Sequence, residues 1–193
     1  QTLALLGGEL GAGILAHVRF AGESPADALV DDHDTACRVA ETVFEGLMQP
    51  TISAYFDTFM DVDRGYFPRN GFIDRRYDAR PASRVYASLH AALAGSRLER
   101  LAEPGADAPQ LRLARADGDL VALVLPTVSQ ASTTLEDWPA GLARPGTAAR
   151  VVDLQTGIES PASLSESGAP CATRDAPLPK GPYLVRFSGA GRT

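Results

Sequence analysis

The stretch TISAYFDTFMDVDRGYFPRNGFID, residues 51–74, changes character along its length. Its first part, TISAYFDTF, is rich in β-branched and aromatic residues, a composition that favours a β-strand. The remainder crowds aspartates and aromatic rings together at the point where that strand ends. A solvated loop explains the aspartates but not the rings, because an exposed ring gains no free energy from burial. We therefore expect an apolar or flat partner to contact these rings.

Helical patterns flank this stretch on both sides. Residues 31–49 have apolar side chains at the three- and four-residue spacing of one helix face, follow aspartates that suit a helix N-terminus, and end before Pro50. Residues 80–93, RPASRVYASLHAAL, predict a second helix with Pro81 in its first turn and Gly95 as its stop. Upstream of both, residues 2–10, TLALLGGEL, form an apolar run that predicts a buried strand, followed by a connection. The order expected for residues 1–95 is strand, helix, strand, helix.

The second half of the chain has a different pattern. Residues 111–126, LRLARADGDLVALVLP, are two short runs joined by Asp117-Gly118, which is a strong hairpin signal. Further short runs follow at residues 149–160 and 182–189, whereas the Pro-, Ser- and Ala-rich residues 159–182 predict a loop. Short strands at this spacing indicate a small antiparallel β-sandwich. We therefore divide the chain into an α/β domain at residues 1–104 and an all-β domain at residues 105–193.

Composition excludes several classes of function. The chain has 193 residues, a net charge of −6 and 18 basic residues that are dispersed, which argues against nucleic acid as a partner. No apolar run reaches the roughly 18 residues of a membrane span. Cys37 and Cys171 lack partners at metal-ligand spacing, and the three histidines are scattered. Residues 61–65 are similar to the start of a calcium loop, but Phe72 stands where its glutamate belongs, so a turn is favoured and we expect no metal or cofactor.

Polar and aromatic residues gather where the two predicted parallel strands end. Glu9 ends the first strand, and Tyr55, Asp57, Phe59 and Asp61 follow the second. Adjacent parallel strands lie about 4.8 Å apart and open towards ligands at their C-terminal ends, so these side chains would face one cleft. Rings stack on the apolar faces of sugars, and carboxylates bind hydroxyls or perform the chemistry. We expect a carbohydrate site here, with the ring of Phe59 half-buried.

Several of these segments together resemble a known family. The strand ending in Glu9, the Asp-opened helix, TISAYFDTFMDV, NGFID and the Arg-Pro-Ala helix resemble the last two βα units of a retaining (β/α)₈-barrel glycoside hydrolase. The β-xylosidase and α-L-iduronidase family is the most similar, and VVDLQTG at residues 151–157 resembles a hairpin of its appended β-sandwich. The resemblance implies that Glu9 is the catalytic nucleophile. It also implies that the segment from Tyr55 to Asp61 lines the subsite of the reacting sugar.

The same resemblance implies a longer protein. Retaining hydrolysis needs two carboxyl groups about 5 to 5.5 Å apart, and a whole barrel takes about 250 residues. The family's acid/base typically follows an asparagine, but the only asparagine here is Asn70. We expect the C-terminal portion of a glycosidase that needs the N-terminal part of its barrel and is inactive alone. Two alternatives stay open: Glu9 as an exposed loop carboxylate, and the chain as a noncatalytic carbohydrate-binding or structural module.

Overall fold

The computed structural model describes residues 13–18, 32–49, 51–56, 59, 60, 71–101, 110–126, 138, 143, 147–171 and 177–188. Its elements, in chain order, are β1 (Ile14–Val18), α2 (Asp32–Leu47), β2 (Ile52–Phe56), α3 (Pro81–Ala92), β3 (Leu98–Arg100), β4 (Leu111–Ala116), β5 (Asp119–Val124), β6 (Ala148–Asp153), β7 (Glu159–Leu164), β8 (Pro170–Cys171) and β9 (Tyr183–Ser188). The first four follow the order strand, helix, strand, helix, but β1 is not the segment that we expected to be the first strand.

β1 and β2 form a two-stranded parallel sheet. Ile14 lies opposite Ile52, and Val18 lies opposite Phe56. Helix α2 connects the two strands, as a parallel pair requires a crossover. The described partner of β2 thus lies in a segment that we expected to be a connection, while the predicted strand at residues 2–10 lies outside the described residues. The missed signal is the short run ILAHV, whose side chains alternate between half-buried and exposed as in a strand with one covered face.

The two helices use the apolar faces that their sequences predict. In α2 the buried side chains are Thr35, Ala36, Val39, Ala40, Val43 and Phe44. In α3 they are Ala82, Val85 and Leu89. Pro81 occupies the first turn of α3, where its missing N–H costs no hydrogen bond, and Gly95 follows the helix with a φ of 74°. Both faces are confirmed because a period of 3.6 residues is a local property of the chain.

The remaining strands form one seven-stranded sheet in the order β3-β4-β5-β9-β6-β7-β8. Every neighbouring pair is antiparallel. Asp117 and Gly118 both have positive φ, 52° and 94°, so the predicted hairpin between β4 and β5 is confirmed. The antiparallel β character of the second half is therefore present. A packing of two facing sheets stays a prediction.

Part of the predicted loop at residues 159–182 is instead strand. β7 pairs with β6, with Pro161 opposite Arg150, and β8 pairs with the end of β7 through Ser163 and Leu164. Proline lacks the N–H of a ladder hydrogen bond, but within the described residues β8 reaches only the last two residues of β7 and leaves Pro161 at the edge of the sheet, where proline is tolerated. Long-range pairing with β6 therefore overrides the loop-like composition.

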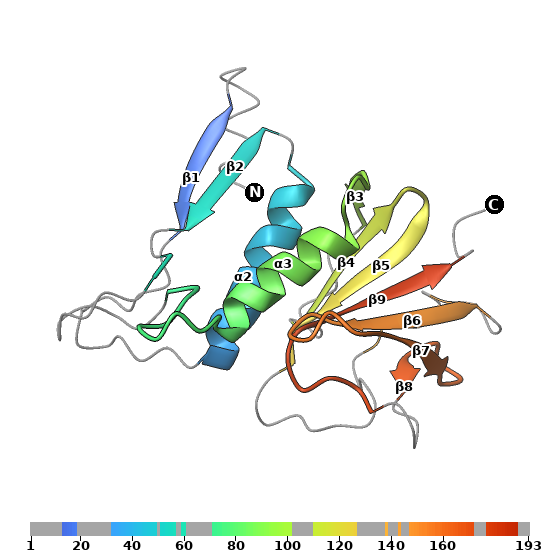
Figure 1. Ribbon diagram of the computed structural model, residues 1–193. Helices are drawn as coiled ribbons and strands as arrows, with labels where there is room; N and C mark the ends of the chain where they lie inside the picture. The colour runs from blue at the N-terminus through green and yellow to red at the C-terminus, as the bar shows by residue number, and fades with distance from the viewer. Residues whose placement is uncertain are drawn as a thin grey trace.

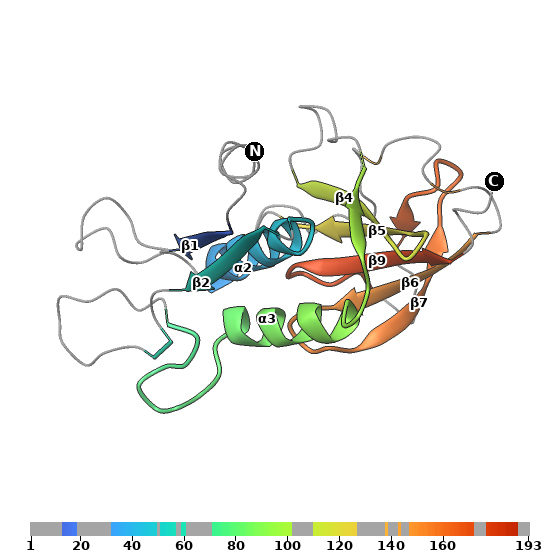
Figure 2. The same ribbon diagram turned by 90° about the horizontal axis from the view of Figure 1, so that it is seen from above.

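The seven-stranded sheet has a hydrophobic core on each face. Along β5, Val121 and Leu123 point to the core that contains both helices, whereas Leu120, Ala122 and Val124 point to a second core with Trp138 and Phe187. Figures 1 and 2 show α2 and α3 between the two-stranded sheet and the seven-stranded sheet. The helices thus form a shared layer, and their packing holds the two sheets in one unit.

Charged side chains close the edge of the contact between α2 and the sheet. Glu41 and Glu45 on α2 form ion pairs with Arg112 on β4 and Arg100 on β3, respectively. The Nε atom of Arg112 also lies 3.9 Å from Oε1 of Glu45, so the four side chains form one network, the α2–sheet ion-pair network. Partial burial of these groups reduces screening by water and makes the network a specific link between helix and sheet.

Candidate functional site

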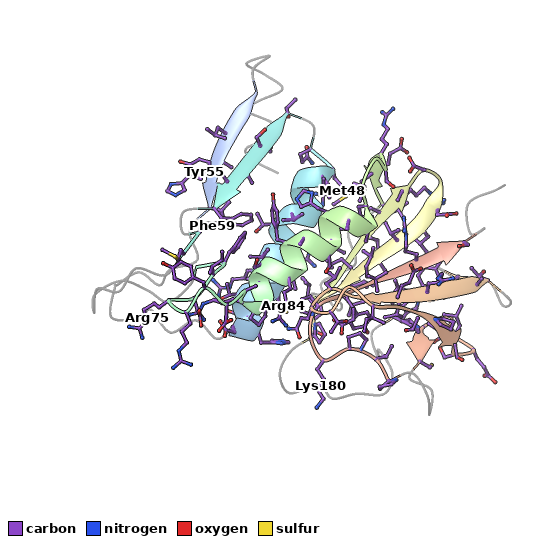
Figure 3. The ribbon with its side chains drawn as sticks, in the orientation of Figure 1. Met48, Tyr55, Phe59, Arg75, Arg84 and Lys180 are labelled. Carbon is purple, nitrogen blue, oxygen red and sulfur yellow. The ribbon has the colours of Figure 1, made fainter. Side chains whose placement is uncertain are left out.

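Two aromatic rings meet at the C-terminal ends of the parallel strands. His17 of β1 and Tyr55 of β2 are register partners, so their side chains project from the same face of the sheet. Their ring centroids lie 4.7 Å apart with an angle of 3° between the planes, which is a stacked pair. The side chain of Tyr55 is 47% exposed, and Figure 3 shows it at the end of its strand. Each ring covers one face of the other, and both residues are exposed to solvent.

The other face of this small sheet belongs to the core. The ring of Phe56 lies 5.2 Å from that of Phe72 and 6.0 Å from that of Tyr86 on α3. Val18 and Phe56 both pack against the helical core. Because side chains alternate along a strand, this packing directs His17 and Tyr55 to the face away from the helices. Leu15 lies on that same outer face and is 70% exposed.

Phe59 lies just beyond β2, and 68% of its side-chain surface is exposed. We expected a half-buried ring, so that expectation is wrong. Its backbone is nevertheless held in place, because the carbonyl oxygen of Phe59 accepts a hydrogen bond of 2.9 Å from the N–H of Ile73. Met60 forms a β-bridge with Ile73 as well. A backbone hydrogen bond and a β-bridge therefore connect the start of the segment after β2 to the segment that leads into α3.

The structure describes two of the five predicted site residues. It places Tyr55 and Phe59 at and just beyond the end of β2. Glu9, Asp57 and Asp61 lie outside the described residues, so their roles stay predictions. The described strand β1 has no carboxylate in its sequence ILAHV, and His17 stands opposite Tyr55.

Sequence reasoning missed His17 because it treated the histidines as scattered. The signal that could have found it is a polar ring at the next-to-last position of a short apolar run that follows a glycine. A residue at such a position faces a ligand only when the run forms a strand beside a parallel neighbour. The run by itself does not show whether that neighbour exists.

A second polar cluster joins α2 to the segment that follows β5. Nε2 of His33 lies 2.7 Å from the carbonyl oxygen of Pro126, and the Cys37 sulfur lies 3.7 Å from the same His33 nitrogen. Burial, together with the negative charges of Asp34 and Glu41, raises the pKa of the Cys37 thiol to about 12. The thiol therefore stays protonated at neutral pH and is a structural group, not a nucleophile.

The part of the chain that the structure describes contains no group of three or more His, Cys, Asp or Glu side chains placed to hold a metal ion. None of its helices is long and apolar enough to cross a membrane.

Comparison with known proteins links this architecture to one class of fold. The chain matches no protein-family profile and no curated protein. Among solved structures, it is similar to a family 39 glycoside hydrolase from the gut symbiont Bacteroides cellulosilyticus, with a TM-score of 0.58 and 16% sequence identity over 91% of this chain. The chain spans 34% of that structure, or about a third of its length.

Two further structures are more distant. One is the catalytic domain of GH30 xylanase C from Talaromyces cellulolyticus, with a TM-score of 0.46 and 11% identity, covering 91% of this chain and 40% of that one. The other is a GH30 endoxylanase from Clostridium papyrosolvens, with a TM-score of 0.46 and 10% identity, covering 100% of this chain and 45% of that one. The conclusion rests on the family 39 structure alone. The chain has a glycoside-hydrolase-like fold.

Proposed function

We propose that this chain is the C-terminal portion of a glycoside hydrolase, and that the ends of β1 and β2 form one wall of its carbohydrate site. The observation that carries the proposal is the stacked pair of His17 and Tyr55 at the C-terminal ends of two parallel strands. Ligands of α/β folds bind beyond the carboxyl ends of the strands, and flat rings suit the apolar faces of sugars.

The exposure of the small sheet supports a partial barrel. One face packs on the helices, while Leu15 on the other face is 70% exposed. In a (β/α)₈ barrel that second face points inward and is filled by side chains of the remaining strands. We assign residues 1–104 to the last two βα units and residues 105–193 to an appended β-sandwich, with β3 of the first segment pairing with β4 of the second. Upstream polypeptide supplies the rest of the barrel.

The proposed reaction is retaining hydrolysis of an O-glycosidic bond. The carboxylate of Glu9 attacks the anomeric carbon while a carboxylic acid from the upstream barrel protonates the leaving oxygen, and water then releases the glycosyl group from Glu9. Glu9 precedes β1 in the chain, so this role requires its carboxylate to reach the opposite, C-terminal ends of β1 and β2. Tyr55 and Phe59 contact the sugar rings, and Asp57 and Asp61 accept hydrogen bonds from hydroxyl groups. The isolated chain lacks the proton donor, and general acid catalysis contributes about 10²- to 10⁴-fold to a rate.

A noncatalytic carbohydrate-binding module is the second candidate. It is favoured by one specific observation, the absence of a carboxylate from the described strand β1, whose end carries the His17 ring instead. In this reading the same strand ends bind sugar through ring stacking, without covalent chemistry.

Kinetics and binding on the full-length protein separate the candidates. The probes are 4-nitrophenyl β-xyloside, β-glucoside and α-arabinofuranoside for turnover, and soluble xylan, mixed-linkage β-glucan and galactomannan for affinity electrophoresis. We expect turnover of at least one aryl glycoside, abolished by Glu9→Gln with the melting temperature unchanged. Two outcomes contradict the assignment of Glu9 as the nucleophile. In the first, the protein binds sugar and Glu9→Gln leaves turnover unchanged. In the second, the protein binds sugar but turns over none of the aryl glycosides. No binding and no turnover contradict the proposed function altogether.

A further inference from the structure

A tight turn precedes α3 in the connection from β2. The N–H of Asp74 donates a hydrogen bond of 2.9 Å to the carbonyl oxygen of Asp78, and the N–H of Tyr77 donates one of 3.0 Å to the carbonyl oxygen of Asp74. Ile73 and Ala79 form an antiparallel bridge on either side. The turn is thus closed by backbone bonds, and we call residues 73–79 the Asp74 turn.

The side chain of Asp74 reinforces this turn from inside. Its Oδ1 atom accepts hydrogen bonds from the N–H groups of Arg76, at 2.7 Å, and Asp78, at 2.9 Å. The backbone N–H of Asp78 is the main reason that the pKa of Asp74 lies below its usual value, and the N–H of Arg76 acts in the same direction. The carboxylate is therefore charged at neutral pH and keeps both bonds.

Tyr77 occupies this turn at a conformational cost. Its φ is 67°, in the left-handed region that side chains with a Cβ rarely adopt, and a bulky residue there is a genuine outlier. Burial does not compensate, because 77% of the Tyr77 side chain is exposed. Glycine or asparagine would fit the backbone better. A strained residue with an exposed ring, held by a well-bonded turn, points to a function for the ring.

The position of the turn indicates what the ring contacts. Ile73, at the start of the Asp74 turn, donates its N–H to the carbonyl oxygen of Phe59, just beyond the end of β2. Figures 1 and 2 both show the segment before α3 beyond the arrowhead of β2. In Figure 3, Tyr55, Phe59 and Arg75 lie on this same side of the molecule. The exposed rings of Tyr55 and Phe59 and the turn that carries Tyr77 therefore lie on one side, at the strand ends.

We infer that Tyr77 is a carbohydrate-contacting residue at the rim of the proposed site, where its ring stacks on a sugar unit of a bound oligosaccharide. The inference rests on the proposed function, because it takes the end of β2 as the place where sugar binds. Stacking uses the ring face, and the hydrogen bonds of the Asp74 turn hold the backbone that carries the ring. The ring then binds without first losing the freedom of a mobile loop.

The test uses the full-length protein. Affinity electrophoresis first shows which polysaccharide the wild type binds among xylan, mixed-linkage β-glucan and galactomannan. The hexasaccharide derived from that polysaccharide is then the ligand. Tyr77→Asn removes the ring but keeps a residue that tolerates positive φ, so the fold is preserved. We expect its Kd to rise about fivefold, in line with an aromatic contact, with an unchanged or higher melting temperature. Tyr77→Phe keeps the ring and is expected to keep the wild-type Kd within about twofold.

Two further variants separate the contact from general effects. Ile158→Ala removes an exposed apolar side chain, 66% exposed, from the connection between β6 and β7, and is expected to leave Kd unchanged. Tyr55→Ala reports on the proposed site itself. If Tyr55→Ala weakens binding and Tyr77→Asn does not, the role of Tyr77 is overturned and the proposed function stands. If the wild type binds none of the polysaccharides, the role of Tyr77 and the proposed function are both contradicted.

Discussion

The thiol of Cys37 shows how burial by the fold sets the chemistry of a single group. Its pKa rises from an ordinary value of 9.0 to about 12, chiefly because burial penalises the thiolate. Only the thiolate is a nucleophile, so the thiol loses reactivity by the same factor as it loses thiolate. At pH 8 a shift of this size leaves about a thousandfold less thiolate than in an unfolded chain.

We predict that Cys37 is inert in the native protein. In a Cys171→Ser variant, which leaves Cys37 as the only thiol, the reaction with 5,5′-dithiobis(2-nitrobenzoate) at pH 8 should be about two to three orders of magnitude slower in native buffer than in guanidinium chloride. Equal rates under the two conditions would contradict the assignment of Cys37 as a buried structural group.

The same shift makes stability depend on pH in the alkaline range. The unfolded thiol ionises near pH 9.0 and the folded one near 12, so ionisation favours the unfolded state between these values. The stabilisation from the neutral thiol is fully present below pH 9 and is lost as the pH rises towards 12. We predict that Cys37→Ser reduces the loss of unfolding free energy between pH 8 and 10.5, measured by urea titration. An identical loss in the variant counts against this linkage.

At the scale of secondary-structure elements, two glycines have opposite roles. Gly118 closes the hairpin between β4 and β5 with a φ of 94°, whereas Gly46 lies in α2 with no heavy atom within 4 Å of an added Cβ. We predict that Gly118→Ala destabilises the protein by about 1 kcal/mol or more, and that Gly46→Ala stabilises it by about 0.5 kcal/mol. Urea titration of both variants measures the two effects. Equal shifts of the same sign would contradict the conformational argument.

At the same scale, the α2–sheet ion-pair network links a helix to two strands. The side chain of Arg112 is 23% exposed and that of Glu41 is 38% exposed, so water still screens their attraction in part. We predict a coupling energy of about 1 kcal/mol from a double-mutant cycle with Glu41→Gln and Arg112→Met, decreasing in high salt.

A matched control for this cycle exists on the surface. Arg97 and Glu99 form an ion pair at 3.8 Å, with side chains 86% and 65% exposed. Such exposed pairs contribute little, so their cycle should give a coupling energy near zero. Coupling energies of the same size in both cycles would show that the link between α2 and the sheet has no special strength.

At the scale of the whole molecule, the helices and the seven-stranded sheet share one core. Leu184 of β9 is fully buried in the cluster that also contains Phe44 of α2 and Leu89 of α3. On the opposite face of the sheet, Trp138, the only tryptophan of the chain, lies 5.6 Å from the ring of Phe187. The helices and Trp138 therefore report on different faces of the same sheet.

We predict that the described parts of the chain unfold as one unit. Circular dichroism at 222 nm follows the helices and Trp138 fluorescence follows the far face of the sheet, and the two urea transitions should coincide. Leu184→Ala should shift both midpoints together, with a loss of about 2 to 5 kcal/mol, because it opens a cavity in the shared core. Separate transitions would mean that the helical layer and the sheet are independent domains.

Local patterns in the sequence were sufficient for part of this structure. The apolar faces of α2 and α3 follow from a spacing repeated within each helix, and the turn at Asp117-Gly118 follows from backbone freedom at adjacent residues. The aromatic character of TISAYFDTF likewise predicted β2 and the place of Tyr55. In each case the interactions that decide the conformation join residues close together in the chain.

Only the tertiary structure decided the rest, because those features depend on partners far away in the chain. β1 becomes a strand through pairing with β2, and Pro161 enters β7 through pairing with β6. The stacking of His17 on Tyr55 needs the register of two strands separated by a helix. By itself the sequence determined which segments are helical and where a hairpin turns. Long-range pairing decided which rings meet at the strand ends.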